Sequence, residues 1–189
     1  MSNRRVRPIL FSAPMVRALL DGRKTQTRRI MKPQPPDGWF ISEDERDEPG
    51  HAEWLAERCP YGAPGDRLWV REAVRWEGGP LAIFEADGSA CVIDTWPWKR
   101  TKLPSIHMPR GASRITLEIT EVRVQRLQEI GEEDARAEGV SPVTWSRPIN
   151  GLLSSYVEGF KTLWGIINGE RAPWSSNPFV WSLTFQGVE

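Results

Sequence analysis

The sequence predicts a single α+β domain whose β-sheet is mostly antiparallel and curled enough to close on itself. Five or six segments alternate apolar and polar residues, as β-strands with one buried face do. One helical segment follows the first strand, and two more come later. The 189 residues are enough to bury one core, so we expect one domain.

The first part of the chain predicts a strand, a helix and a second strand. Residues 6–12 have strand composition, and Pro8 places this strand at a sheet edge or at its own start. Apolar residues then recur at helical spacing over 13–21, and Gly22 is expected to end the helix. The Thr-rich segment 25–31 predicts the second strand.

The middle of the chain predicts three further strands and a loop. A Pro-Gly-Asp turn precedes the strand 67–75. Two short strands near 81–85 and 90–94 are joined by an Asp-Gly turn, which is typical of hairpins. Residues 95–113 are expected to form an irregular, basic loop.

The last third contains the clearest strand of the sequence. Apolar residues alternate over 114–125, and a phase slip at 121–122 predicts a β-bulge. A short helix over 129–139 has acidic residues in its first turn, which favours the helix dipole. A longer amphipathic helix over 152–168 and a final strand over 179–186 complete the expected fold.

Charge is segregated along the chain although the net charge is zero. Residues 1–32 carry nine Lys and Arg against one acid, and residues 96–114 carry five against none. Between them, residues 37–57 carry eight acids against Arg46 alone. The basic segments can form an electropositive face for a nucleic acid, or they are solvated surfaces without a partner.

The composition favours a soluble, cytoplasmic protein without a cofactor. No stretch approaches the roughly 20 apolar residues that cross a bilayer, and the N-terminus does not resemble a signal peptide. Two cysteines give no disulfide framework. Cys59, Cys91, His51 and His107 are too scattered for a metal signature, and no phosphate-binding glycine loop is present.

Four segments in order resemble the ASCH domain family. The segment Gly22–Arg29 resembles the family's GxKxxExR signature, with Gly22, Lys24 and Arg29 matching and Thr27 in place of Glu. The bacterial N4-acetylcytidine amidohydrolases of this family also have Thr there. The segment 64–72 is similar to the family's turn and strand after the signature, and 114–139 is the third segment. The closing helix 152–168 with Asn177–Trp181 resembles the larger ASCH proteins of phages and prophages. The stretches 33–58, 77–112 and 140–150 resemble insertions.

This resemblance implies a PUA-like barrel with a cleft beside the helix that follows the first strand. Related domains bind RNA or modified bases there, some hydrolyse an acyl group from N4 of cytidine, and some have been proposed to cleave RNA. The amidohydrolases use a Lys, a Thr three residues later and a Glu, which correspond here to Lys24, Thr27 and Glu138. Glu132 or Glu133 are alternatives to Glu138.

The chemistry of this triad sets two conditions. Lys24 acts as a base only when it is partly neutral; neighbouring arginines lower its pKa, whereas Glu138 raises it. Lys24 and Thr27 have opposite parity on a regular strand, so they converge only if Lys24 lies in the turn after Gly22. Without the resemblance, threonines in a strand and basic residues after a helix would be ordinary structural features.

Four further residues are expected to bind the substrate: Arg29, Trp69, Arg71 and Glu72. Trp69 and Arg71 alternate on the face of their strand opposite Glu72, so one of these faces can line the cleft. Three functions stay open: an amidohydrolase, a non-catalytic module that binds RNA or a modified base, and a ribonuclease that uses Lys24 and Arg29 on the phosphate. We expect no membrane partner, and the oligomeric state stays open.

Overall fold

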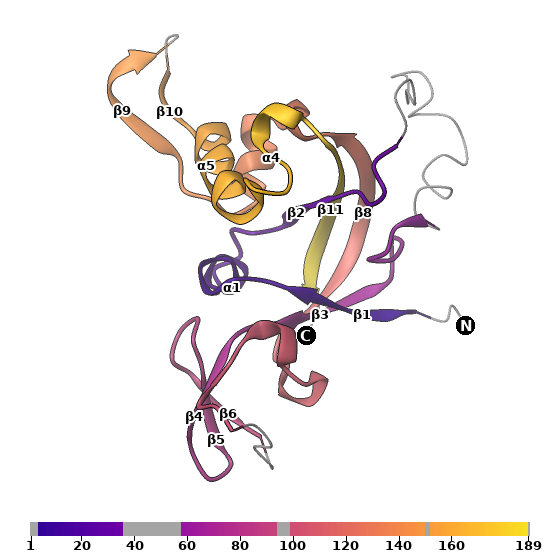
Figure 1. The fold of residues 1–189 in the computed structure, drawn as a ribbon, viewed down its shortest axis with the longest axis vertical. Helices are drawn as coiled ribbons and strands as arrows, with labels where there is room; N and C mark the ends of the chain where they lie inside the picture. Colours follow the sequence, from indigo (N-terminus) through magenta and orange to yellow (C-terminus); the bar gives the residue numbers. More distant parts are fainter. Residues whose placement is uncertain (1–3, 36–57, 94–98, 150–151, 189) are drawn as a thin grey trace.

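The structure is a computed structural model that describes residues 4–35, 58–93, 99–149 and 152–188 (Figure 1). It has an α+β fold, as predicted. The acidic segment 37–57 lies outside the described residues, together with most of the expected insertion 33–58. Among the described residues, no helix is long and apolar enough to cross a membrane.

The main sheet contains the five strands that the sequence predicts to share one sheet. Its order is β1-β3-β8-β11-β2, and every ladder is antiparallel except the parallel pair β1–β3. The strands are β1 (Val6–Leu10), β2 (Gln26–Ile30), β3 (Arg67–Arg71), β8 (Thr116–Arg126) and β11 (Phe179–Val188). The ladder begins at β1 and ends at β2, and in the described part of the chain no pairing joins these two edges. Strand pairing therefore shows a mostly antiparallel sheet but not a closed barrel.

The predicted bulge lies in the ladder between β8 and β11. Thr184 of β11 pairs with Glu121, and the next residue, Phe185, pairs with Ile119, so the extra residue is Thr120. Thr120 and Glu121 are both exposed, and burial resumes at Val122. The bulge is one residue away from the predicted phase slip, and it re-aims the strand beyond it.

A second, four-stranded sheet lies beside the first, at the lower end of the molecule in Figure 1. Its order is β6-β5-β4-β7, with β4 (Val74–Gly78), β5 (Leu81–Phe84), β6 (Ala90–Val92) and β7 (Lys102–Leu103). The predicted single strand 67–75 is wrong, because the chain leaves the main sheet at Arg71 and enters the second at Val74. The expected loop 95–113 contains β7 and two 3₁₀ turns, Ser105–His107 and Arg110–Ala112.

Three helices lie against the main sheet, and a hairpin projects beyond them at the upper left of Figure 1. The helices are α1 (Ala13–Leu20), α4 (Glu132–Ala137) and α5 (Tyr156–Asn168), and the hairpin consists of β9 (Val143–Ile149) and β10 (Leu152–Ser155). The expected helix 152–168 therefore begins four residues late. Ser155 explains this start, because its hydroxyl accepts a hydrogen bond from the Glu158 N–H and caps α5.

The main core lies between the main sheet and α1, and it is apolar. Its most deeply buried members come from four strands and one helix: Ile9, Val16, Leu68, Val70, Ile119 and Leu183. A second cluster packs α4 and α5 over the end of β8, around Leu127, Phe160 and Trp164. The polar residues described next lie between these two clusters, where α4 meets β2.

Candidate functional site

Lys24 lies in the turn between α1 and β2. Gly22 adopts a left-handed conformation with φ of 70°, which turns the chain back on the helix. The Lys24 N–H donates to the Ala18 carbonyl at 2.9 Å, and β2 begins only at Gln26. The condition that Lys24 precedes the strand is therefore met.

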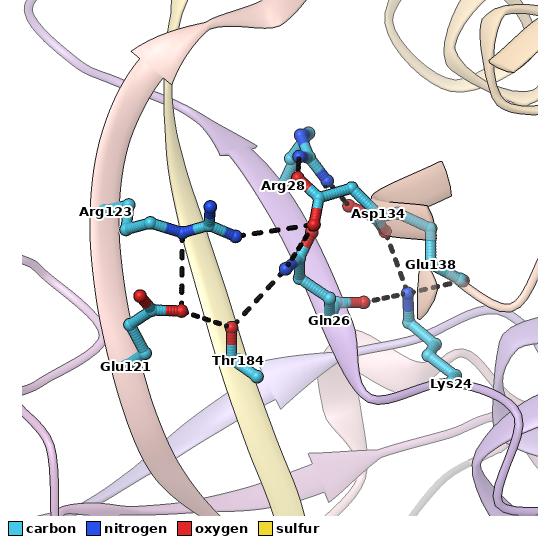
Figure 2. Close-up of polar contacts among 8 residues, drawn as sticks. All are labelled: Lys24, Gln26, Arg28, Glu121, Arg123, Asp134, Glu138 and Thr184. Atoms are coloured by element: carbon cyan, nitrogen blue, oxygen red, sulfur yellow. Dashed lines mark hydrogen bonds and ion pairs between the residues drawn. The ribbon is translucent and has the colours of Figure 1, made fainter. Parts of the chain in front are cut away.

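The Lys24 ammonium group is buried and has three acceptors. Its side chain is 1% exposed. Figure 2 shows Nζ between β2 and the end of α4, at 2.7 Å from the Gln26 carbonyl, 2.8 Å from the Glu138 carbonyl and 3.0 Å from Glu138 Oε2. An ammonium group has three N–H donors, so each has a partner. The Phe11 ring centre lies 5.3 Å from Nζ on the core side.

Burial lowers the pKa of Lys24, because the charged form loses its hydration. Glu138 opposes this effect, and the positive charges of Arg29 and Arg28 add to it. The effects of these charges have the directions expected from the sequence. The largest cause of the lowered pKa, the burial of Lys24, could not be predicted from the sequence. A lysine whose pKa is lowered has a larger neutral fraction and is a better base at neutral pH.

Glu138, rather than Glu132 or Glu133, is the carboxylate beside Lys24. It follows α4 directly, and its side chain is 4% exposed. Glu132 instead accepts hydrogen bonds from the Ser155 hydroxyl and the Tyr156 N–H, at the start of α5. Glu133 is exposed. The structure thus settles which of the three carboxylates contacts the lysine.

Arg28 links Glu138 to a second carboxylate. Its side chain is fully buried; Nη2 lies 2.6 Å from Asp134 Oδ2, and Nη1 lies 3.3 Å from Glu138 Oε1 and 2.6 Å from Gln26 Oε1. Burial would raise the pKa of Asp134, but Arg28, together with Arg123 and Gln26, holds that pKa below its usual range. Figure 2 shows the contacts continuing to Arg123, a residue of β8.

Sequence analysis missed Gln26, Arg28 and Asp134, although their spacing carried a signal. Gln26 and Arg28 are two residues apart on a strand and therefore share a face. Asp134 and Glu138 are four residues apart at the end of a helix and also share a face. An ion-pair network between a strand and a helix requires donors on one shared face and carboxylates on the other, and these two pairs supply them.

Thr27 lies on the other face of β2. Gln26 and Arg28 point toward α4, so the alternation of the strand directs Thr27 to the main core, where it pairs across the ladder with Leu183. Thr27 is 2% exposed. Within the described ranges, no hydrogen bond joins its hydroxyl to Lys24 or Glu138. The structure brings the lysine and the carboxylate together and leaves the threonine on the opposite side of the strand.

Of the four expected substrate-binding residues, Arg29 lies nearest to this cluster. Its guanidinium donates to the Leu10 carbonyl at 2.7 Å and lies 5.2 Å from the centre of the Phe11 ring, which Lys24 also approaches. Arg29 and Arg28 both line a surface pocket of about 380 Å³, together with Lys32. Arg29 thus connects the surface with the buried pair.

The other three expected binding residues have different partners. Arg71 donates to the Met108 carbonyl at 3.2 Å and stacks on Trp69, with 5.2 Å between its guanidinium and the ring centre. Glu72 is 1% exposed, and both its oxygens accept hydrogen bonds from Arg114 at 2.9 Å. Their polar contacts lie where the chain passes from β3 of the main sheet to β4 of the second sheet, and they do not include Lys24 or Glu138.

Gly139 sets how closely the end of α4 approaches Lys24. Its φ is 80°, and a Cβ at this position would lie 2.8 Å from the Cβ atoms of both Ala18 and Lys24. We expect Gly139→Ala to lower the free energy of unfolding by about 2–5 kcal/mol, from backbone strain plus overpacking. Denaturant unfolding measures this loss. Gly22→Ala is the control, because φ is 70° there but nothing lies within 4 Å of the added Cβ, so only strain of about 1–2 kcal/mol applies. Equal losses at both positions would contradict the close approach.

Comparisons with known proteins do not assign the chain to a family. No protein-family model and no curated protein matches it. The chain is similar in structure to protein EF3133 from Enterococcus faecalis V583, of the family DUF984, with a TM-score of 0.43 and 12% identity over 100% of this chain and 82% of that one. This likeness is too low to support a function.

Proposed function

We propose that this chain is a cytoplasmic hydrolase that removes an acyl group from N4 of cytidine, in the nucleoside or within RNA. The observation that supports this most is the buried Lys24, with its lowered pKa, 3.0 Å from Glu138 Oε2. Perturbed ionisable pairs of this kind are more frequent at catalytic sites than elsewhere. The resemblance of Gly22–Arg29 to the ASCH signature supplies the reaction, and a PUA-like barrel with a cleft beside α1 is the fold that belongs to it.

In the proposed reaction, Lys24 carries one proton from the nucleophile to the leaving N4 atom. A nucleophilic oxygen attacks the acyl carbon, and neutral Lys24 accepts its proton. The tetrahedral intermediate then collapses with cleavage of the bond between the acyl carbon and N4, and Lys24 returns the proton to N4. Glu138 holds the ammonium form in place between these steps. With water as the nucleophile, which the position of Thr27 across β2 favours, this step releases the free acid. With Thr27 as the nucleophile, as the resemblance implies, the acyl group passes to the threonine oxygen, and a water that gives its proton to Lys24 then hydrolyses this ester.

The non-catalytic alternative is supported by the same ion pair. Three acceptors saturate Nζ of Lys24, as in an ion pair that only stabilises a fold, and a substrate must displace one of them. The ribonuclease alternative has less support, because the hydrogen-bond partners of Lys24 are Glu138 and Gln26, inside the protein. Incubating the purified protein with N4-acetylcytidine and with a short RNA separates the three. Cytidine indicates the hydrolase, shortened RNA the ribonuclease, and binding without either product the module.

The pH dependence of the hydrolysis should follow Lys24. If the neutral amine is the base, kcat/KM rises with pH, with an apparent pKa below that of an ordinary lysine. Glu138 raises the pKa of Lys24, so Glu138→Gln should move the midpoint of the residual activity to lower pH. Thr27→Val changes no charge and should leave the midpoint where it is. Activity that falls as pH rises, or a midpoint that Glu138→Gln moves to higher pH, would contradict the role of Lys24.

A further inference from the structure

The surface pocket beside Arg28 is strongly basic. It lies between β2, the turn at Tyr61 and the end of α5, and its volume of about 380 Å³ is within the range of small-molecule sites. Its polar lining consists of four cations and two neutral side chains, with no Asp or Glu among the described residues that line it: Arg28, Arg29, Lys32, Arg171, Tyr61 and Asn168.

Three of these four cations have no carboxylate partner in the part of the chain that the structure describes. Arg28 is neutralised by Asp134 and Glu138. Arg29 donates to a backbone carbonyl instead, and neither Lys32 nor Arg171 forms an ion pair with a described residue. A guanidinium has five N–H donors, so Arg29 retains donors for another acceptor.

The burial of Arg29 makes this excess of charge costly. Burial lowers the pKa of its guanidinium, and the opposing effects of Tyr61 and Glu138 do not outweigh it. An anion in the pocket would compensate the charge where no described carboxylate does. The three cations come from β2, from the segment after it and from the segment after α5, so they surround the space rather than follow one surface.

We propose that this pocket binds the phosphate group of a cytidine nucleotide, while the base reaches the Lys24–Glu138 pair. A phosphate monoester carries nearly two negative charges and three acceptor oxygens, which match the three cations that have no carboxylate partner among the described residues. The Tyr61 hydroxyl and the Asn168 amide supply neutral donors. Arg28 lines the pocket and lies 3.3 Å from Glu138, so the two sites adjoin. This inference rests on the proposed hydrolase and names its substrate as phosphorylated.

Binding measurements by calorimetry at low salt test the pocket without turnover. The ligands are cytidine, cytidine 5′-monophosphate, inorganic phosphate and a short cytidine-containing RNA. We expect the monophosphate to bind at least about tenfold more tightly than cytidine, as charge-assisted hydrogen bonds would give. The double variant Lys32→Gln/Arg171→Gln should remove this preference, since both side chains are exposed and their loss spares the fold. Lys161→Gln is the control, because Lys161 is an exposed lysine of α5 that does not line the pocket.

The outcomes separate the pocket from the hydrolase. If only the RNA binds more tightly than cytidine, and the double variant loses this preference, the phosphate site is supported and the phosphate that it binds is that of RNA. Competition by inorganic phosphate supports it as well. Equal affinity for cytidine and its monophosphate, or an unchanged preference in the double variant, overturns the pocket even if N4-acetylcytidine is hydrolysed. Conversely, a phosphate preference without hydrolysis rejects only the proposed reaction.

Discussion

Glu138→Gln should lower kcat/KM for N4-acetylcytidine by about 10²–10⁴-fold, because Lys24 then lacks the carboxylate that holds its ammonium form, and general acid–base catalysis usually contributes this much. The substitution keeps the size of the side chain and an oxygen that can accept from Lys24, so the fold should persist. Glu133→Gln is the matched control, because Glu133 is an exposed carboxylate of α4, the helix that Glu138 directly follows, and Glu138 is the one that contacts Lys24. Steady-state kinetics on both variants, with thermal unfolding as a check of folding, measures the difference.

Lys24→Met gives a second measure of the same pair. It removes the base, so turnover should be lost, and it leaves Glu138 buried with Arg28 as its remaining cation. Breaking a buried ion pair costs about 3–5 kcal/mol, so this variant must be assayed below its lowered melting temperature. If folded Glu138→Gln and folded Lys24→Met both retain full activity, the pair is structural only.

The second large effect should occur at the junction of the two sheets. Arg114→Met is expected to lower the free energy of unfolding by about 3–5 kcal/mol, because it leaves the carboxylate of Glu72 buried without a partner. Arg114 also lies 3.9 Å from the centre of the Phe84 ring and 2.8 Å from Asp87, and both contacts are lost with its guanidinium. Urea unfolding measures the loss.

An exposed ion pair of β4, in the second sheet, provides the control. Arg75 and Glu77 are 54% and 37% exposed, so Arg75→Met should cost no more than about 1 kcal/mol. The double variant Glu72→Gln/Arg114→Met should recover part of the stability lost in Arg114→Met, since no buried charge then remains unpaired. Similar losses for Arg114→Met and Arg75→Met would contradict the importance of the buried pair.

The strands of the main sheet were predictable because each has one face in the core. In segments such as 114–125, alternation marks that face directly, and the phase slip marked the bulge to within one residue. The break after Arg71 was not predictable, because alternation continues through it while the chain moves from one sheet to the other. The late start of α5 was not predictable either, because the apolar residues before Ser155 continue the helical spacing. The start depends instead on the cap that Ser155 forms.

The site was predictable only in part. The resemblance placed Lys24 beside a carboxylate, and the turn at Gly22 made this contact possible. The alternation of side chains along β2 places Thr27 on one face of the strand, but it does not say which layer covers that face. The burial of Thr27 toward the main core was therefore not foreseen. For the same reason Glu72 was expected at a cleft, whereas Arg114, from the segment before β8, pairs with its buried carboxylate. Burial also controls the pKa of Lys24, and it depends on packing between distant segments.

The most direct test is an NMR measurement of N4-acetylcytidine in the presence of a small amount of the unaltered protein. The proposed function predicts that acetate and cytidine appear in equal amounts, over many turnovers for each protein molecule, and that neither appears with Lys24→Met. Shifts of the nucleoside signals that report binding, with no acetate released by the unaltered protein, would contradict the hydrolase and leave a module that only binds its base.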